Sequence, residues 1–140
     1  MKYEDYHQNP INQIIHVVCI PIIVISTINL ISLIQRRFLE RDRNGLIPIF
    51  MAFYYFFKYS FFISFVMLIY YTFAVTISDA WLINDNYNLY KTIKVFIMAW
   101  ILQFIGHYIE GSSPALFDGI ASAFTEAPLY SLNNIFRILN

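Results

Sequence analysis

An apolar run of 32 residues extends from Leu46 to Ile77, and Lys58 is its sole charged side chain. Two further apolar runs, at residues 11–34 and 92–109, are close to or above the roughly 20 residues that cross a bilayer as a helix. Charged residues make up 13% of the chain, whereas soluble domains average about 25%. The sequence therefore predicts an all-α polytopic membrane helical bundle, with residues 1–140 forming a single integral membrane domain.

Net charge and cysteine content exclude several classes of protein. Formal net charge is zero, so no surface for nucleic acid is expected. The single cysteine, Cys19, excludes an internal disulfide and a cysteine zinc cluster, and its apolar neighbours indicate a packing role. No cleavable signal peptide is expected, because the first nine residues are polar and no small-residue cleavage site follows.

The length of the 46–77 run decides the membrane topology. One straight helix of 32 residues would measure about 48 Å, against a hydrocarbon core of about 30 Å. Strong tilt would absorb part of the excess. The alternative is a short helical hairpin over 46–77, with arms of roughly 20 Å and its corner in the sequence FKYS at residues 57–60. The hairpin gives about four membrane passes in total, and we favour it.

Local signals mark the ends of the first and last helices. Asn9 is a good N-cap with Pro10 at the first helical position, and Pro21 is expected to kink this helix without ending it. In the tail, a helix capped by Ser113 is expected to end at Pro128. Apolar residues then recur at positions 129, 132, 136 and 139, which predicts a short C-terminal re-entrant or interfacial helical segment.

The three histidines, His7, His16 and His107, are the leading candidates for a functional site. The first two lie at the entrance of the first helix, and the third lies near the end of the 92–109 span. All three lie at one face of the membrane only if the 46–77 run enters the membrane and returns to the face from which it started. A shared histidine site therefore requires the hairpin. Ionisable groups inside apolar spans are costly and point to function by default.

Four more polar residues accompany this pattern. Glu110 follows the third histidine by one turn and is either part of a site or a simple interfacial carboxylate. The amides of Asn12 and Gln103 precede the second and third histidines by one turn, where they would orient imidazoles as partners of metal ligands do. Lys58, at the hairpin corner, is a weak candidate for contact with a substrate carboxylate. Snorkelling to the interface is the simpler interpretation.

Two motifs at opposite ends of the chain carry a resemblance to a known family. The segment YHQNPINQIIHVVCIP (residues 6–21) resembles H-x-x-P-x-N-x-x-x-H-x-x-x-x-P, and WILQFIGHYIEGSSPALFDGI (residues 100–120) resembles Q-F-I-G-H-x-x-E-G-x-x-P-A. The sequence APLY at 127–130 is similar to the tail of the same family. These motifs are typical of the iron-dependent 2-hydroxy fatty acid dioxygenases, a small membrane family whose fungal member acts in phytosphingosine breakdown in the endoplasmic reticulum.

The resemblance implies an enzyme of fatty acid alpha-oxidation. Such an enzyme would use Fe(II) and O2 to remove one carbon from a long-chain 2-hydroxy fatty acid taken from the lipid bilayer. The family's histidines correspond to His7, His16 and His107 as metal ligands. Its glutamate corresponds to Glu110, whose role as ligand, base or outer partner stays open. Histidines with a carboxylate suit non-haem iron chemistry, although histidine also serves zinc.

Two other classes of function also fit the residues. One is a non-catalytic membrane protein in which the histidines and Glu110 form a polar network or hold a structural metal. The other is a haem-binding membrane protein with His16 and His107 as axial ligands. An optical spectrum separates haem from a non-haem iron site.

The orientation in the membrane stays open as well. Six basic residues lie in loops opposite the predicted site, and the positive-inside rule places these loops in the cytoplasm. A supply of Fe(II) argues for the reverse orientation. Both a bacterial inner membrane and the endoplasmic reticulum membrane are compatible with the sequence. The six residues are Arg36, Arg37, Arg41, Arg43, Lys91 and Lys94.

Overall fold

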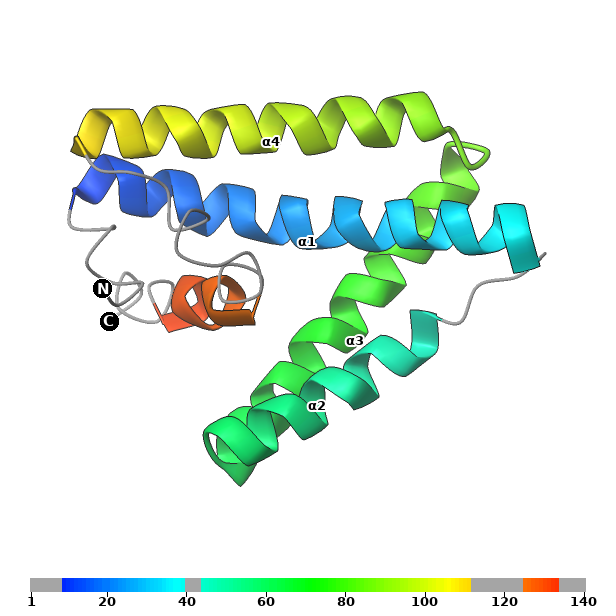
Figure 1. Cartoon of the computed structure of the whole chain (residues 1–140), viewed down its shortest axis with the longest axis horizontal. Coiled ribbons are helices and arrows are strands. Elements are labelled where there is room, and N and C mark those ends of the chain that lie inside the picture. The colour runs from blue at the N-terminus through cyan, green and yellow to red at the C-terminus, as the bar shows by residue number, and fades with distance from the viewer. Residues whose placement is uncertain (1–8, 40–43, 112–124, 134–140) are drawn as a thin grey trace. The chain divides into compact units, whose positions relative to one another are not determined.

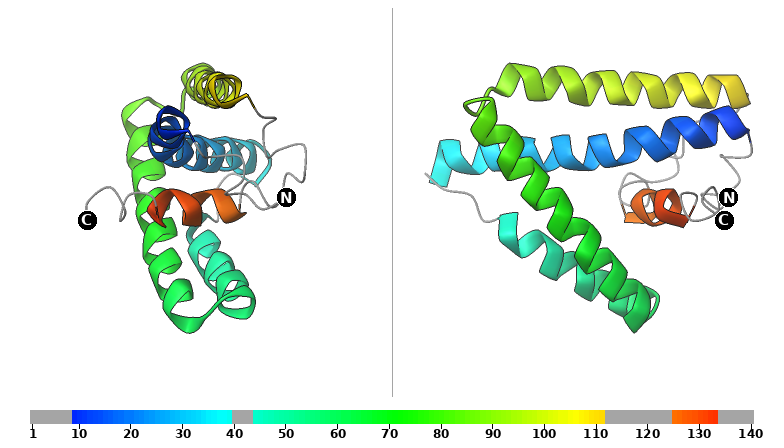
Figure 2. Two further views of the ribbon diagram at one scale, coloured as in Figure 1. Left: turned by 90° about the vertical axis from the view of Figure 1, so that its left-hand side faces the viewer. Right: turned by 180° about the vertical axis from the view of Figure 1, so that it is seen from behind.

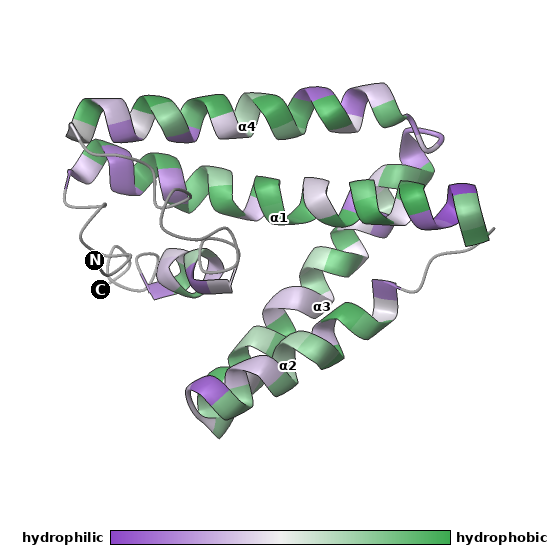
Figure 3. Ribbon diagram, viewed as in Figure 1, coloured by the Kyte–Doolittle hydropathy of each residue, from purple (hydrophilic) through white to green (hydrophobic). Residues whose placement is uncertain are grey.

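The structure is a computed structural model that describes residues 9–39, 44–111 and 125–133, and every regular element in these ranges is helical. The elements are α1 (Pro10–Leu39), the short 3₁₀ helix η2 (Asn44–Leu46), α2 (Ile47–Lys58), α3 (Phe61–Asn84) and α4 (Leu89–Glu110), followed by a helix over 125–133 (Figure 1). Three helices, α1, α3 and α4, are long and apolar enough to cross a membrane, and Figure 3 shows apolar residues along all three. The predicted all-α class is confirmed for the described residues.

The first helix begins where the sequence predicts. The Asn9 side-chain oxygen accepts a hydrogen bond from the Ile11 N–H at 2.9 Å, which satisfies one of the unpaired donors of the first turn. Pro10 is the first residue of α1, and the helix continues through Pro21 to Leu39. The prediction that Pro21 does not end the helix is therefore confirmed.

The 46–77 run is divided into two helices, as predicted. Ser60 has an extended backbone, and its hydroxyl accepts a hydrogen bond from the Ile63 N–H at 3.2 Å, so it caps α3. The two helices pack antiparallel (Figures 1 and 2). The Ser64 hydroxyl donates to the carbonyl oxygen of Ala52 across their contact, at 2.6 Å. A hairpin with its corner at residues 57–60 is therefore confirmed.

The two arms of this hairpin differ in length, in contrast to the prediction of two short helices. The 12 residues of α2 measure about 18 Å and the 24 residues of α3 about 36 Å. Helix α3 continues past Ile77 through Asp79, and Leu82 in this extension is 1% exposed. Because α2 is shorter than a membrane span, the predicted count of four full passes is not confirmed.

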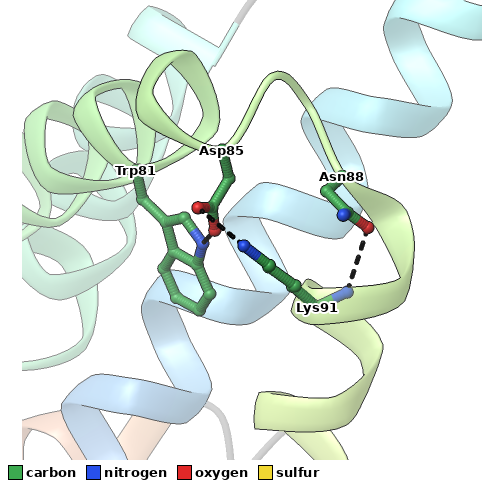
Figure 4. Close-up of polar contacts among 4 residues, drawn as sticks. All are labelled: Trp81, Asp85, Asn88 and Lys91. Atoms are coloured by element: carbon green, nitrogen blue, oxygen red, sulfur yellow. Dashed lines mark hydrogen bonds and ion pairs between the residues drawn. The ribbon is translucent and has the colours of Figure 1, made fainter.

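A tight turn connects α3 to α4. The Trp81 ring N–H donates to the Asp85 carboxylate at 2.7 Å, and the Lys91 ammonium lies 3.6 Å from the other oxygen of the same carboxylate. The Asn88 side chain accepts from the Lys91 backbone N–H at 3.3 Å (Figure 4). Asn86, in the left-handed region at φ 53°, suits this turn because asparagine tolerates that conformation.

The chain forms two compact units. One contains residues 1–24 and 94–140, and the other contains residues 25–93, so α1 and α4 contribute residues to both. The α2–α3 hairpin belongs to the second unit, and both described histidines belong to the first. The prediction of a single membrane domain remains a prediction.

The tail helix over 125–133 belongs to the first unit and is largely buried. Its buried residues are Ala127, Pro128, Tyr130 and Ser131. The described helix continues through Pro128 to residue 133, in contrast to the prediction that Pro128 ends it. The predicted helix start at Ser113 lies outside the described residues. The re-entrant or interfacial character of the tail is not confirmed.

Candidate metal centre

Two of the three histidines meet inside the first unit. The ring centroids of His16 on α1 and His107 on α4 are 4.9 Å apart, and the rings are nearly perpendicular at 85°. The two residues are 1% and 3% exposed. The first turns of α1 and the last turns of α4 therefore lie side by side and antiparallel (Figure 1). The histidine pair and the hairpin, which the sequence hypothesis required together, are both present.

Helical spacing brings the two imidazoles to one contact. Buried residues recur every three or four positions along the start of α1 and the end of α4, which is the period of one helix face. The opposite face of α4 is exposed, with Tyr108 at 87%, and it suits contact with lipid. Cys19 is 2% exposed, which confirms its packing role. The buried positions are Asn12, His16, Cys19, Ile20, Ile23 and Val24 on α1, and Ala99, Gln103, Gly106 and His107 on α4.

The main chain of α1 orients the His16 ring. His16 Nδ1 lies 2.9 Å from the carbonyl oxygen of Asn12, one turn earlier. A carbonyl oxygen can only accept a hydrogen bond, so Nδ1 carries the proton in this contact. In the neutral ring, the lone pair is then on Nε2, a buried atom. Metal-binding histidines commonly donate their other N–H to a carbonyl in this way. The described contact uses the main chain of Asn12, not the side-chain amide predicted from sequence.

The Asn12 side chain lies instead against α4. It occupies the space next to Gly106, where a Cβ atom would overlap the Asn12 side-chain oxygen and would lie 3.3 Å from its Cγ. Sequence reasoning did not single out Gly106. The glycine of the motif Q-F-I-G-H was an available signal, but the sequence does not show which residue of α1 it faces.

Comparison with known proteins identifies the family. A family model described as "2-hydroxy-palmitic acid dioxygenase Mpo1-like" matches residues 1–137. The chain belongs to the Mpo1-like family. Neither a curated protein nor a solved structure matches the chain. The matched range includes all three histidines and Glu110, so the family suspected from the two motifs is confirmed.

Two of the four proposed Mpo1-like ligands can be placed. Within residues 9–39, 44–111 and 125–133, no cluster of three or more histidine, cysteine, aspartate or glutamate side chains has the arrangement of a metal site. His7 lies outside these ranges, and the side chain of Glu110 is outside the described set. The described part of the predicted site is therefore the pair His16 and His107.

The separation of the two rings fits one shared ion. Two imidazoles that bind one ion at adjacent positions have ring centroids roughly 4.5–5.5 Å apart, given metal–nitrogen bonds of about 2 Å. The observed separation is 4.9 Å. His16 Nε2 and His107 Nδ1 are both buried, so bulk water does not compete with an ion for these two nitrogens.

The remaining predicted residues fall in different units. Gln103, 4% exposed, lies one turn before His107, and its Nε2 is buried without a hydrogen-bond partner among the described residues. Lys58 belongs to the second unit, where its ammonium donates to the Tyr54 hydroxyl at 3.0 Å and lies 5.7 Å from the Tyr59 ring centroid. Its contact with substrate stays a prediction.

Proposed function

We propose that this chain is a membrane dioxygenase that removes one carbon from long-chain 2-hydroxy fatty acids, with 2-hydroxypalmitic acid as the reference substrate. Fe(II) is held by His7, His16 and His107, with Glu110 nearby. The observation that carries the proposal is the buried contact between His16 and His107 in a chain of the Mpo1-like family.

The overall reaction balances without an organic cosubstrate. A 2-hydroxy acid, RCH(OH)COOH, and O2 give RCOOH, CO2 and H2O. The C1–C2, C2–H and O–O bonds break, the hydrogen from C2 ends in water, and the two substrate carbons together lose the four electrons that O2 takes up. Bound Fe(II) supplies Lewis-acid and template chemistry, in which the hydroxyl and one carboxylate oxygen of the substrate are brought beside O2.

The residues of the chain prepare the site for this chemistry. The Asn12 carbonyl holds the His16 ring in the tautomer that presents Nε2. Gln103 supplies a buried N–H donor on the same face of α4 as His107, which suits a substrate carboxylate oxygen. The acyl chain reaches the site from the bilayer, since the outer faces of α1 and α4 expose apolar side chains such as Ile14, Val18 and Ile105.

The ring geometry favours a small ion over haem. A haem with His16 and His107 as its two axial ligands would lie between the rings. Rings in edge-to-face contact at 4.9 Å leave no room for a macrocycle. A non-catalytic polar network or a structural metal is separated from the enzyme by assay.

The deciding experiment is oxygen uptake by the purified, Fe(II)-loaded protein in nanodiscs after addition of 2-hydroxypalmitic acid. We expect O2 consumption with release of the acid that is one carbon shorter, and none with palmitic acid, which lacks the chelating hydroxyl. His107→Ala is expected to abolish uptake. Tyr108→Ala, a neighbouring change on the exposed face of α4, is the matched control and should retain it. A folded, iron-loaded wild-type protein that consumes no O2 with 2-hydroxy acids of several chain lengths would overturn the proposal.

A further inference from the structure

Gly106 on α4 lies directly against Asn12 of α1, beside the two histidines. An added Cβ would overlap the Asn12 side-chain oxygen, would lie 3.3 Å from Asn12 Cγ and would lie 3.5 Å from Cδ1 of Ile15. Real Cβ atoms do not make the first of these contacts, and the second is tighter than nearly all of them. Asn12 is 0% exposed, so a shift of its side chain would take place among buried neighbours and not into solvent.

The same few residues also make the histidine contact. Gly106 precedes His107, and Asn12 and Ile15 precede His16 on the adjoining turn of α1. The Asn12 side chain fills the space beside Gly106, while its carbonyl oxygen accepts from His16 Nδ1. One residue of α1 therefore sets both the approach of the helices and the orientation of the ring.

We propose that Gly106 is a positioning residue, which lets the Asn12 side chain seat against α4 and thereby sets the separation of His16 and His107. The inference rests on the proposed function only in that the pair is taken to bind a metal ion. In membrane helices, small residues at an interface allow backbones to approach closely. Here the close approach lies beside two candidate ligands, so a displacement of α4 would separate the imidazoles.

The test is a double-mutant cycle between Gly106 and Asn12, read with Co²⁺ as a coloured probe in place of Fe²⁺. Gly106→Ala should weaken Co²⁺ binding roughly tenfold or more, the loss typical when the support of a metal ligand is disturbed. Asn12→Ala removes the obstructing atoms and keeps the main-chain carbonyl that holds His16. In that background, Gly106→Ala should cost much less affinity. The visible absorption of bound Co²⁺ reports the coordination geometry independently of turnover.

Gly45→Ala is the matched control. Gly45 has no atom within 4 Å of an added Cβ and belongs to the second unit, so the change should alter neither Co²⁺ affinity nor thermal stability. The thermal midpoint of unfolding is also measured for the same four proteins, namely the wild type, the two single variants and the double variant, without metal. This second readout still reports the packing of Asn12 against Gly106 if Asn12→Ala alone abolishes Co²⁺ binding.

The outcomes separate this inference from the proposed function. The positioning role would be overturned if Gly106→Ala lowered both the Co²⁺ affinity and the thermal midpoint by the same amount in the wild type and in the Asn12→Ala variant. Wild-type behaviour of Gly106→Ala would overturn it as well. If the coupling appears in the thermal midpoint but the wild-type protein binds no metal, the helix contact stands, whereas the metal centre and the positioning of ligands fail. Coupling in affinity without any O2 uptake supports the positioning role and contradicts the dioxygenase.

Discussion

At the scale of single residues, five polar side chains of α1 are buried along a largely apolar helix. Asn12, His16, Ser26, Asn29 and Ser32 are each at most 1% exposed. A polar group facing lipid has no hydrogen-bond partner there, so such residues turn toward other helices. The sequence of α1 thus selects the face that packs, and the first two of these five residues lie at the candidate metal centre.

A substitution of Gln103 is expected to affect the stability and the activity of the protein in opposite directions. Its Nε2 is buried and has no hydrogen-bond partner among the described residues, a costly arrangement of about 1–3 kcal/mol for a group with no other role. Gln103→Leu keeps a similar volume and removes the amide. We expect equal or higher stability with at least a severalfold loss of oxygen uptake, because the donor for the substrate is lost. Thermal unfolding and oxygen uptake of the same preparation test this expectation.

Thr92→Val is the control for Gln103→Leu. The Thr92 hydroxyl is also buried without a partner among the described residues, on the same helix but in the unit that lacks the histidines. Its removal should leave stability equal or higher and oxygen uptake unchanged. Full activity of Gln103→Leu would show that the amide has no part in catalysis.

The sequence predicted which histidines form the candidate site, but not which residues of α1 and α4 contact each other around them. His16 and His107 follow from their rarity in apolar spans and from the family motifs, and the structure brings them together. The Gly106–Asn12 contact depends on the rotation of α4 about its axis and on its shift along α1. No single-helix pattern contains these quantities. The same limit explains why the side-chain amide of Asn12, not its carbonyl, was expected to orient His16.

At the scale of the helices, Ser60 determines where the apolar 46–77 run divides. Its hydroxyl accepts from the Ile63 N–H, and without it the first turn of α3 loses a side-chain acceptor. Ser60→Ala should lower the free energy of unfolding by about 1 kcal/mol. Ser60→Thr, which keeps a capping hydroxyl, should lower it by much less. Reversible unfolding in mixed micelles measures both, and equal losses for the two variants would rule out a capping role.

A polar contact between buried side chains joins α1 to α3 within the 25–93 unit. The Ser78 hydroxyl donates to the side-chain oxygen of Asn29, and both residues are 0% exposed. Hydrogen bonds between membrane helices contribute about 0.6–2 kcal/mol. We expect Ser78→Ala to lower the free energy of unfolding by an amount in that range.

Thr76 supplies the comparison for Ser78. Its hydroxyl donates to the Thr72 carbonyl of its own helix, at 2.8 Å, on the exposed side of α3. Thr76→Val should therefore have little effect on unfolding in the same micelles. A loss for Ser78→Ala no larger than that for Thr76→Val would show that the contact between α1 and α3 does not contribute to stability.

At the scale of the whole molecule, apolar periodicity predicted the helices more reliably than it predicted their ends. The break at residues 57–60 could be predicted, because one straight helix would exceed the bilayer and the charge of Lys58 marks the corner. The extension of α3 to Asn84 could not. Asp79 and Asp85 have the composition of a loop, yet Leu82 packs in the interior and the Trp81 ring donates to Asp85. The helix through Pro128 was missed because proline was expected to break a helix, whereas the described helix continues past it.

The histidine contact makes a definite prediction of topology. Since His16 lies near the start of α1 and His107 near the end of α4, the segments before α1 and after α4 should emerge on one face of the membrane. The 22 residues of α4 measure about 33 Å, long enough to span the hydrocarbon core, so Asn84, five residues before α4 begins, should lie on the other face.

Single cysteines at Tyr3, Ser113 and Asn84 in a Cys19→Ala background test this topology with an impermeant thiol reagent on intact membranes. Tyr3→Cys and Ser113→Cys should react from the same side, and Asn84→Cys only from the opposite side. The side on which Asn84→Cys reacts also decides between the positive-inside orientation and its reverse. Reaction of Tyr3→Cys and Ser113→Cys from opposite sides would mean that the two histidine-bearing helix ends do not meet in the membrane, and the shared metal centre would have to be abandoned.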